Sequence, residues 1–449
     1  MIVAKFGGTS VGDPEAIQRL IGIVAARRAE QPLVVVSALS KVTDALLDLA
    51  RPIAAGDEAG VLRALEALDQ RHASVASALP GAERAMEPIR DDLAAIRQQA
   101  LGSLGQALAP RHLDALAGFG ELWSSLIVTM AMQGAGLPAV WCDVRPVMRT
   151  DDRFTRATPL TEHLPERARA EFGPLLEAGK IPVTQGFLGS TLDGIPTTLG
   201  RGGSDFTASL LGAALDAERV EIWTDVDGLM TADPRIVPSA RTLPQATYEE
   251  AAELATFGAK VLHPATQLPL AERGIPFTIL NSRRPENGGT VIAPDVDHRG
   301  LSTPIRSISW KKGIIVINVR APRMLGAYGF LRALFEVFER HEVVVDVLAS
   351  GEVSVSLTIE DGSKLDLLRR ELSELGEVTI FERRAIIAVV GVGLRDTPGL
   401  GARIFAAVRP ANVELISQGA SAINMTFIVR EEEAPDAVRR LHREFFGTD

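Results

Sequence analysis

The sequence predicts an α/β protein with a mainly parallel sheet and helices on both sheet faces, followed by two smaller βαββαβ units. Two observations carry this prediction. Over residues 1–295 short apolar segments alternate with amphipathic helical segments, which is typical of a parallel sheet covered by helices. Over residues 313–449 one order of strands and helices recurs after about 65–70 residues. A chain of 449 residues has room for roughly two to four domains.

The chain begins with an apolar strand, IVAKF, which is followed by two glycines and by a helical pattern from near Pro14. Paired glycines let backbone N–H groups approach an anion closely, and a helix N-terminus adds a partial positive charge. Lys5, Thr9 and Ser10 would supply a cation and hydroxyl donors to a phosphate. The alternative is an ordinary strand–turn–helix with a capping Thr or Ser. It is not a Walker loop, because no Gly-Lys-Ser/Thr closes it.

The following elements continue the alternation. The Ala- and Leu-rich stretch 56–117, interrupted at Pro80-Gly81, Pro88 and Pro110, indicates a helical insertion without chemistry of its own. The other expected strands lie at 32–39, 137–144, 181–187, 219–226 and 276–282, and the expected helices at 14–28, 43–50, 121–133, 161–178, 205–215 and 245–273.

The last third of the chain is an internal repeat. Its copies span 313–383 and 384–449, and the second copy lacks a final strand. The segment 303–310 is strand-like and has no partner in either copy, so we expect it to cross over and complete the second one. The glycine-rich stretch 391–401 is interpreted as a loop of the repeat, because Asp396 stands where a dinucleotide fingerprint needs glycine.

Composition excludes several classes of function. The net charge of -10 argues against a nucleic-acid partner, which would favour a basic face. The single cysteine, Cys142, excludes an intrachain disulfide and a cysteine metal cluster, and its apolar neighbours indicate a buried thiol. No leader precedes Lys5 and no apolar run approaches the ~20 residues of a membrane span, so we expect a cytoplasmic protein.

The segment KFGGTSVG at 5–12 closely resembles a motif of the aspartate kinases, which belong to the amino-acid-kinase superfamily. Further blocks match that family in order: 34–47, 118–125, 147–154, 184–187, 198–208, 223–235 and 257–266. The C-terminal repeat resembles a pair of ferredoxin-like ACT domains, the effector-binding modules of these kinases. The resemblance implies a catalytic domain at 1–297, a first ACT domain at 313–383, and a second at 384–449 that is completed by 303–310.

The activity implied by the resemblance is ATP-dependent phosphorylation of the side-chain carboxylate of L-aspartate to 4-phospho-L-aspartate, the first step toward lysine, threonine and methionine. A carboxylate with a pKa near ~4 is already ionised at neutral pH, so the acceptor needs no general base. The site must instead hold two anions in line and neutralise the charge of the transferring oxygens. Lysines, an arginine, glycine turns and helix N-termini would do this.

The resemblance assigns residues to each of these tasks. Phosphate contacts are expected from Lys5, Gly7, Gly8, Thr9 and Ser10, substrate contacts from Thr43, Glu121, Arg201 and Ser204, and further nucleotide contacts from Thr224, Asp225, Asp233, Arg235 and Lys260. Lys5 and Asp205 are the expected catalytic residues. Asp205 would orient the lysines and hold the Mg²⁺ of ATP through water, so that nucleotide and water are the main ligands of the metal and no protein metal site is expected.

Individual residues leave alternatives open. Arg201 suits a carboxylate because its guanidinium binds bidentately, which a lysine cannot do. Glu121 would suit the ammonium group of aspartate, although Glu121 and Asp205 could also simply cap helices. Met230 stands where the family usually has an aromatic residue, which would weaken stacking on the base. His263 is interpreted as a structural residue at a helix end.

Regulation by lysine is implied by the resemblance to the single-activity, lysine-inhibited type. Its effector site corresponds to Met324, Phe330, Leu331, Val345, Asp346, Ser350, Glu352 and Val353. Val344 and Gly351 replace serines that are usual in that type, which puts lysine as the effector in doubt. Paired ACT units usually assemble across a two-fold axis, so we expect a homodimer, with a tetramer of two such dimers as an open alternative.

Two other functions compete with this interpretation. One is another kinase of the superfamily, acting on N-acetylglutamate or UMP, but Thr43, Glu121 and Arg201 together with the duplicated module favour aspartate. The other is a catalytically silent amino-acid sensor, against which Lys5, Arg201 and Asp205 argue. The missing dinucleotide fingerprint argues against a fused homoserine dehydrogenase.

Overall fold

The computed structural model describes residues 1–258, 264–296, 303–324 and 328–447, which form two compact units. The described residues of unit 1 are 1–228, 244–248 and 264–296, and those of unit 2 are 229–243, 249–258, 303–324 and 328–447. The two compact units do not begin and end at the domain bounds predicted from the sequence. Those domain bounds therefore stay a prediction.

Unit 1 is built on an eight-stranded sheet in the order β3-β4-β2-β1-β7-β9-β10-β8. The strands are β1 (Ile2–Phe6), β2 (Pro32–Val36), β3 (Ala139–Trp141), β4 (Ile181–Gln185), β7 (Arg219–Thr224), β8 (Gln245–Thr247), β9 (Phe277–Asn281) and β10 (Thr290–Ala293). Every neighbouring pair is parallel except β9 and β10. The predicted mainly parallel sheet is confirmed, and β1 lies near its centre.

Helices pack on this sheet from both sides. Ala4 and Phe6 of β1 share one apolar core with α1 (Pro14–Ala26) and α6 (Pro110–Gly134). Side chains alternate along a strand, so Lys5 points to the opposite face, where α8 (Gly203–Ala214) packs against β1. The remaining helices are α2 (Val42–Asp48), α3 (Ala50–Ala55), α4 (Glu58–Ser77), α5 (Met86–Gly102), α7 (Leu164–Glu177) and α10 (Leu268–Arg273), and a hairpin joins β5 (Leu188–Ser190) to β6 (Pro196–Thr198).

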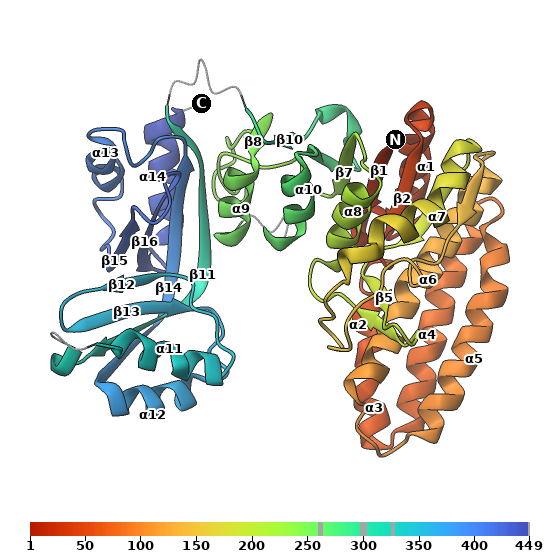
Figure 1. Cartoon of the computed structure of the whole chain (residues 1–449), viewed down its shortest axis with the longest axis horizontal. Helices are drawn as coiled ribbons and strands as arrows, with labels where there is room; N and C mark the ends of the chain where they lie inside the picture. Colours follow the sequence, from red (N-terminus) through yellow and green to blue (C-terminus); the bar gives the residue numbers. More distant parts are fainter. Residues whose placement is uncertain (259–263, 297–302, 325–327, 448–449) are drawn as a thin grey trace. The chain divides into compact units, whose positions relative to one another are not determined.

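Two boundaries expected from the sequence are wrong. Pro88 does not interrupt a helix, because it lies in the first turn of α5, where backbone N–H groups have no partner inside the helix. The helical insertion does not end at residue 117 either, since α6 continues from Pro110 to Gly134 (Figure 1). By length and composition α6 could cross a membrane, but 72% of its most apolar window is buried inside the protein, as in the core helix of a soluble protein.

Unit 2 contains an antiparallel sheet in the order β12-β13-β11-β14-β16-β15. The two longest strands, β11 (Ile305–Arg320) and β14 (Glu377–Gly391), run through both of its halves (Figure 1). Residues 314–320 of β11 face 377–384 of β14, with β13 (Ser354–Ile359) and β12 (Leu348–Ser350) alongside. Residues 305–312 of β11 pair with 385–391, with β16 (Asn424–Arg430) and β15 (Leu415–Gln418) alongside.

Each half of unit 2 adds two helices to its strands. They are α11 (Phe330–Arg340) and α12 (Leu365–Leu375) in the first half, and α13 (Leu400–Ala407) and α14 (Ala434–Phe446) in the second. The two predicted βαββαβ units are therefore present. The long strands β11 and β14 each contribute one part to the first unit and the other part to the second. The stretch 391–401 runs from the end of β14 through a loop to α13, which is the interpretation made from Asp396.

A segment from the middle of the chain also packs on this sheet. Thr231 Oγ1 lies 3.0 Å from His442 Nε2 of α14, and Ser307 Oγ of β11 donates to the carbonyl of Met230. The expected helix 245–273 is interrupted: β8 occupies 245–247, and α9 (Tyr248–Thr256) contributes Glu253, which accepts a hydrogen bond from Asn424. That residues 229–243 and 249–258 belong to unit 2 was not visible in the sequence, because nothing local to them differs from their neighbours.

Gly134 tests the packing of α6 on the helical insertion. A Cβ at Gly134 would lie 1.8 Å from the carbonyl oxygen of Pro80, whereas a Cβ at Gly22 of α1 meets no atom within 4 Å. We expect Gly134→Ala to lower the thermal midpoint by several degrees, since overpacking costs ~1–3 kcal/mol. Gly22→Ala, the matched control, should raise it slightly, because alanine is the better helix former. Equal midpoints for the two variants in differential scanning fluorimetry would contradict the packing described.

Candidate active site

Lys5 is a buried cation near the end of β1, one residue before Phe6. Its Nζ lies 2.5 Å from Oδ1 of Asp205, and the two side chains are 8% and 15% exposed. Asp205 stands in the first turn of α8, so the ion pair joins the end of the central strand to the start of this helix. A Cβ at Gly7 would lie 3.5 Å from the Lys5 Nζ, which places the cation directly beside the glycine turn.

The glycine turn is held by backbone contacts. The N–H of Gly7 donates to the carbonyl of Trp223 at 3.0 Å, and that of Ser10 donates to the carbonyl of Gly7 at 2.8 Å. A Cβ at Gly8 would approach the Ala38 carbonyl to 3.1 Å, so a side chain there would crowd the loop after β2. Thr9 is exposed, whereas Ser10 is buried with its hydroxyl 2.7 Å from Oγ of Ser282.

Glu121 lies in the middle of α6 and is 4% exposed. Burial raises the pKa of its carboxyl to about 8, although backbone hydrogen bonds and the charge of Lys5 oppose the shift. Its Oε2 is buried and has no hydrogen-bond partner within the described part of the chain. A Cβ at Gly120 would lie 2.8 Å from the Ala38 Cβ and 3.5 Å from Oγ1 of Thr43, so α6 comes close to the start of α2.

Arg201 stands on a glycine loop before α8. Gly200 and Gly202, at φ 74° and 75°, flank it in the left-handed region, and its side chain is exposed. The loop continues into Ser204, whose Cβ would be only 2.5 Å from a Cβ at Gly186 after β4. The predicted residues Lys5, Ser204, Asp205 and the glycine turn therefore meet where parallel strands end, which is where ligands bind in open α/β sheets.

The adjacent end of β7 carries Thr224 and Asp225, whose side chains lie 3.3 Å apart. The Thr224 carbonyl accepts from the N–H and the hydroxyl of Ser282, and that hydroxyl also contacts Ser10. Ser282 was not identified from the sequence. It directly follows β9, so the rule that ligands bind where parallel strands end could have identified it.

The comparisons with known proteins agree with this geometry. Residues 1–281 match the model of the amino acid kinase family, and residues 387–445 match an ACT domain. Lysine-sensitive aspartokinase 3 of Escherichia coli is 38% identical over 99% of both chains. The chain belongs to the aspartokinase family. The chloroplastic aspartokinase 2 of Arabidopsis thaliana is 35% identical over 100% of this chain and 84% of its own length.

Solved aspartokinase structures extend the match to the fold. E. coli aspartokinase III in complex with aspartate and ADP has a TM-score of 0.85 at 37% identity, covering 99% of this chain and 100% of its own. Its complex with lysine and aspartate gives 0.82 at 38% identity, with 99% of each chain covered. The aspartate kinase of Clostridium acetobutylicum gives 0.81 at 27% identity, covering 99% and 100%. The resemblance stated from KFGGTSVG is thus confirmed.

Some residues predicted from the aspartokinase motifs fall outside the described residues of unit 1. Asp233 and Arg235 belong to unit 2, where the Arg235 guanidinium forms a bidentate pair with the Asp233 carboxylate (2.7 Å) and lowers its pKa. Lys260 and His263 lie outside the described residues. Met230, the departure noted above, is half-buried in unit 2.

The predicted effector residues gather in the first half of unit 2. Met324, Phe330 and Val345 pack against its apolar core, while Leu331, Ser350 and Glu352 are exposed and Val353 is half-buried. Burial, helped by the charge of Glu360, raises the pKa of Asp346 to about 6. Its Oδ2 is buried and has no hydrogen-bond partner among the residues described. Val344, one of the two residues that stand where serines are usual, is 76% exposed.

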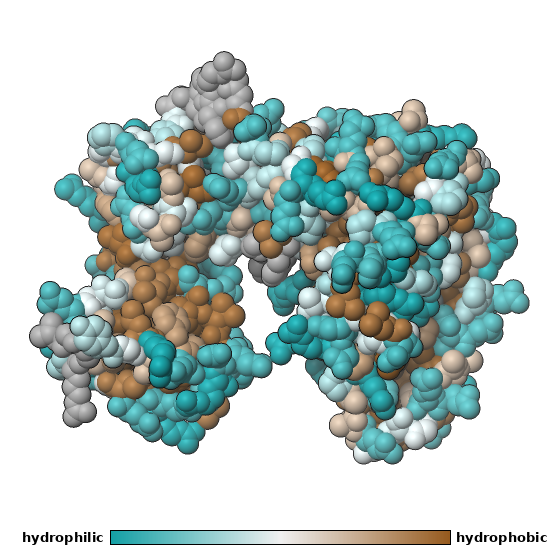
Figure 2. Space-filling view, in the orientation of Figure 1, coloured by the Kyte–Doolittle hydropathy of each residue, from teal (hydrophilic) through white to brown (hydrophobic). Residues whose placement is uncertain are grey.

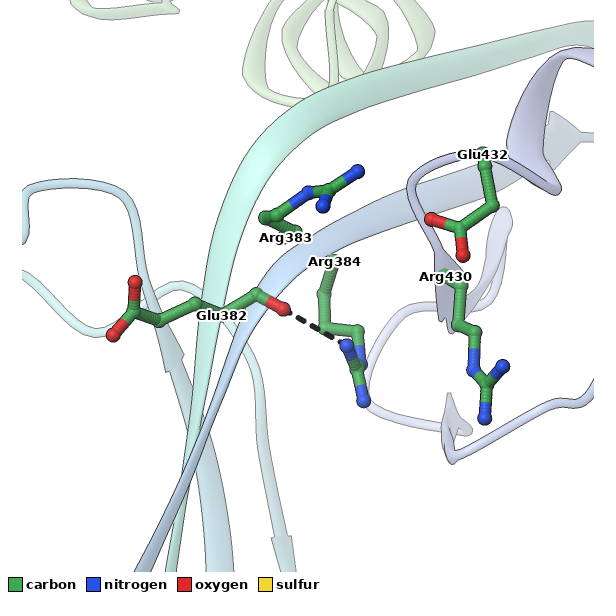
Figure 3. A pocket seen from close by; sticks show the side chains of 5 residues that line it. All are labelled: Glu382, Arg383, Arg384, Arg430 and Glu432. Carbon is green, nitrogen blue, oxygen red and sulfur yellow. Dashed lines mark hydrogen bonds between the residues drawn. The ribbon is translucent and has the colours of Figure 1, made fainter.

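A separate surface hollow in unit 2 is lined by Glu382, Arg383, Arg384, Arg430 and Glu432 (Figure 3). Arg384 is already engaged, because it donates to the Glu382 carbonyl and pairs with Glu414 at 2.6 Å. The predicted site residues do not line this hollow.

The helical insertion contributes a contact that sequence analysis missed. Arg71 of α4 donates from Nη2 to the carbonyl of Gly12 at 2.7 Å and so supports the end of the glycine turn. No sequence signal distinguishes it, since a basic residue on an amphipathic helix usually faces solvent.

The raised pKa of Glu121 predicts a pH-dependent stability. Because the pKa lies above its unfolded value, the folded state loses stability as pH rises from about 4.5 to 8. We expect Glu121→Gln to change the thermal midpoint little at about pH 5 and to raise it at about pH 8.5.

Glu221→Gln is the control, because Glu221 is equally buried but pairs with Arg27 at 2.5 Å and with Arg219 at 2.9 Å. Breaking a buried pair leaves an uncompensated charge, so this variant should be less stable at both pH values. A gain for Glu121→Gln that does not grow with pH would contradict the assignment.

Proposed function

We propose that this chain transfers the γ-phosphoryl group of ATP to the side-chain carboxylate of L-aspartate. One carboxylate oxygen attacks the γ-phosphorus, the bond to the bridging oxygen of ADP breaks, and 4-phospho-L-aspartate and ADP leave. The observation that carries this proposal is the Lys5–Asp205 pair beside the glycine turn, with Glu121 within reach of the charge of Lys5. The E. coli relative solved with aspartate and ADP supports the choice of substrates.

Aspartate is held through its two α-substituents. Arg201 binds the α-carboxylate bidentately, and Glu121 binds the ammonium group, with Thr43 and Ser204 as further contacts. A buried carboxyl with a pKa of about 8 is largely neutral at pH 7, so binding of the ammonium group ionises Glu121 and releases a proton. The unpartnered Glu121 Oε2 supplies the acceptor.

ATP is held by the glycine turn and the strand ends beside it. Lys5 neutralises the transferring oxygens, and Gly7, Gly8, Thr9 and Ser10 surround the phosphates. Thr224 and Asp225 contact the rest of the nucleotide. Proton abstraction is not needed, since the acceptor is already ionised.

Mg²⁺ fits this arrangement as an ion that arrives with ATP. It would withdraw negative charge from the phosphate oxygens. Asp205 is a carboxylate in the first turn of α8, beside Lys5 of β1, which suits an ion bound mainly by nucleotide and water. Its pairing with Lys5 keeps both groups oriented until the phosphates bind.

Lysine is the proposed effector of the ACT units. The partly unpaired Asp346 carboxylate and the exposed Glu352 offer negative charge to its ammonium groups. The solved complex of the E. coli relative with lysine and aspartate supports this choice. The effector would act by shifting the populations of two states.

The ACT units also favour a homodimer, or a tetramer of two such dimers, and a cytoplasmic location stays our expectation from the sequence. Figure 2 shows apolar surface gathered on the first half of unit 2, where the exposed large apolar side chains include Leu331, Phe335, Val344 and Phe381. The edge strands β12 and β15 of the sheet leave backbone groups that a second copy could cover.

The direct test of the proposed activity is ADP release with aspartate, followed in a coupled assay. We expect Lys5→Ala to reduce kcat by about 10²–10³ or more, because charge stabilisation of the transition state is lost. Lys180→Ala removes an exposed lysine of the same unit and should leave kcat unchanged. An unaltered rate in Lys5→Ala, or binding of aspartate and lysine without any ADP release, would overturn the activity.

Lysine inhibition should depend on pH through Asp346. Its raised pKa keeps the carboxyl neutral below about pH 6, so inhibition should weaken between about pH 7.5 and pH 5.5. Glu352→Ala should raise the half-inhibiting lysine concentration about fivefold or more, since one charged contact is lost. Glu339→Ala, which removes an exposed acid from α11, is the control and should not shift it. An enzyme indifferent to lysine would remove this proposal.

A further inference from the structure

Asp114 is a buried carboxylate with an unusual set of partners. It lies in the second turn of α6 and is 2% exposed. The N–H of Thr155 donates to both of its oxygens, at 3.0 and 2.9 Å. The N–H of Thr198 donates to Oδ2 at 3.0 Å, and the Thr198 hydroxyl donates to Oδ1 at 2.7 Å. One side chain thus captures the backbones of two loops that are far apart in sequence.

The first captured loop is strained. Thr155 has φ 71°, in the left-handed region that a β-branched residue rarely adopts. Such a conformation persists only where its surroundings fix it, and the N–H that Asp114 holds belongs to this residue. The strain at Thr155 indicates that contacts with the rest of the protein, and not local backbone preference, fix the position of this loop.

The second captured loop leads to Arg201. Thr198 ends β6 and is followed by Leu199, Gly200 and Arg201. The two loops also contact each other: the N–H of Ala157 donates to the Thr198 carbonyl at 2.9 Å, and a Cβ at Gly200 would lie 3.3 Å from the Thr155 carbonyl oxygen. Asp114 therefore fixes the position of the loop that carries Arg201.

Asp114 and Glu121 lie on the same side of one helix. They are seven residues apart, which is about two turns, so their side chains leave α6 in nearly the same direction. Glu121 is the proposed partner of the substrate ammonium group, and Asp114 holds the loop of the proposed partner of the α-carboxylate. A single rigid helix thus sets the separation of the two groups that hold aspartate.

We propose that Asp114 is a positioning residue for the α-carboxylate of the amino-acid substrate and acts through Arg201. This inference rests on the proposed function of Arg201. The competing role is a purely structural one, in which Asp114 ties the loops to α6 and affects stability alone.

The test is a double-mutant cycle in the ADP-release assay. Asp114→Asn keeps the shape but turns an amide NH₂ toward N–H donors, so the loops lose at least one acceptor. We expect its KM for aspartate to rise about tenfold, as for loss of a hydrogen bond to a charged group, with little change in the KM for ATP. In an Arg201→Ala background the same substitution should change the aspartate KM by less than about twofold.

Asp92→Asn is the matched control. Asp92 is a partly buried carboxylate of α5 that accepts from Nε1 of Trp123 in α6, far in sequence from the Arg201 loop. It should lower the thermal midpoint and leave the aspartate KM unchanged. If Asp114→Asn does not fold, Thr198→Val removes only the 2.7 Å hydroxyl contact and should raise the aspartate KM about threefold.

The outcomes separate the two proposals. Equal effects of Asp114→Asn with and without Arg201, or an unchanged aspartate KM in Asp114→Asn and in Thr198→Val, would overturn the positioning role. An unchanged aspartate KM in Arg201→Ala alone would instead overturn the function proposed for Arg201.

Discussion

The structure of unit 1 depends on neutralising one buried lysine. Removing an ammonium group from water is costly unless it is paired, and Asp205 pairs with Lys5 at the point where the central strand ends. A buried ion pair adds little net stability, because desolvation offsets much of the attraction. The pair is better explained by the reaction, in which phosphate oxygens need a fixed cation and any solvent-exposed lysine would first have to be ordered.

The same constraint organises the surroundings of the site. Gly8 lets the glycine turn pass close to the Ala38 carbonyl in the loop after β2, and Gly120 lets α6 approach the Ala38 side chain. Glu121 is carried by α6, whose packing is fixed elsewhere, so its Oε2, which has no hydrogen-bond partner among the described residues, can remain buried until a cation arrives. Lys5 and Glu121, two ionisable groups that the proposed reaction uses, are thus already desolvated by the fold.

Much of this could be predicted from the sequence. The alternation of apolar strands and amphipathic helices predicted the parallel sheet, and the strand-like segment 303–310 without a partner predicted its pairing with the second repeat. Motif residues such as Lys5 and Asp205 could be identified because they stand next to glycine turns. Asp114 and Arg71 could not, since each is an isolated charged residue on a helix whose partners are backbone groups distant in sequence. The packing of residues 229–243 and 249–258 on the sheet of unit 2 was hidden for the same reason, because contacts such as that of Thr231 with His442 have no local signal.

The central claim is that fixed positive groups bring two anions together for one phosphoryl transfer. The most direct measurement is a crystal structure of the protein with L-aspartate and a nonhydrolysable ATP analogue. The account predicts that the Lys5 ammonium contacts the γ-phosphate while the Arg201 guanidinium binds the α-carboxylate of the same reacting aspartate. A complex in which Lys5 and Arg201 line separate sites, with the side-chain carboxylate out of reach of the γ-phosphate, would contradict it.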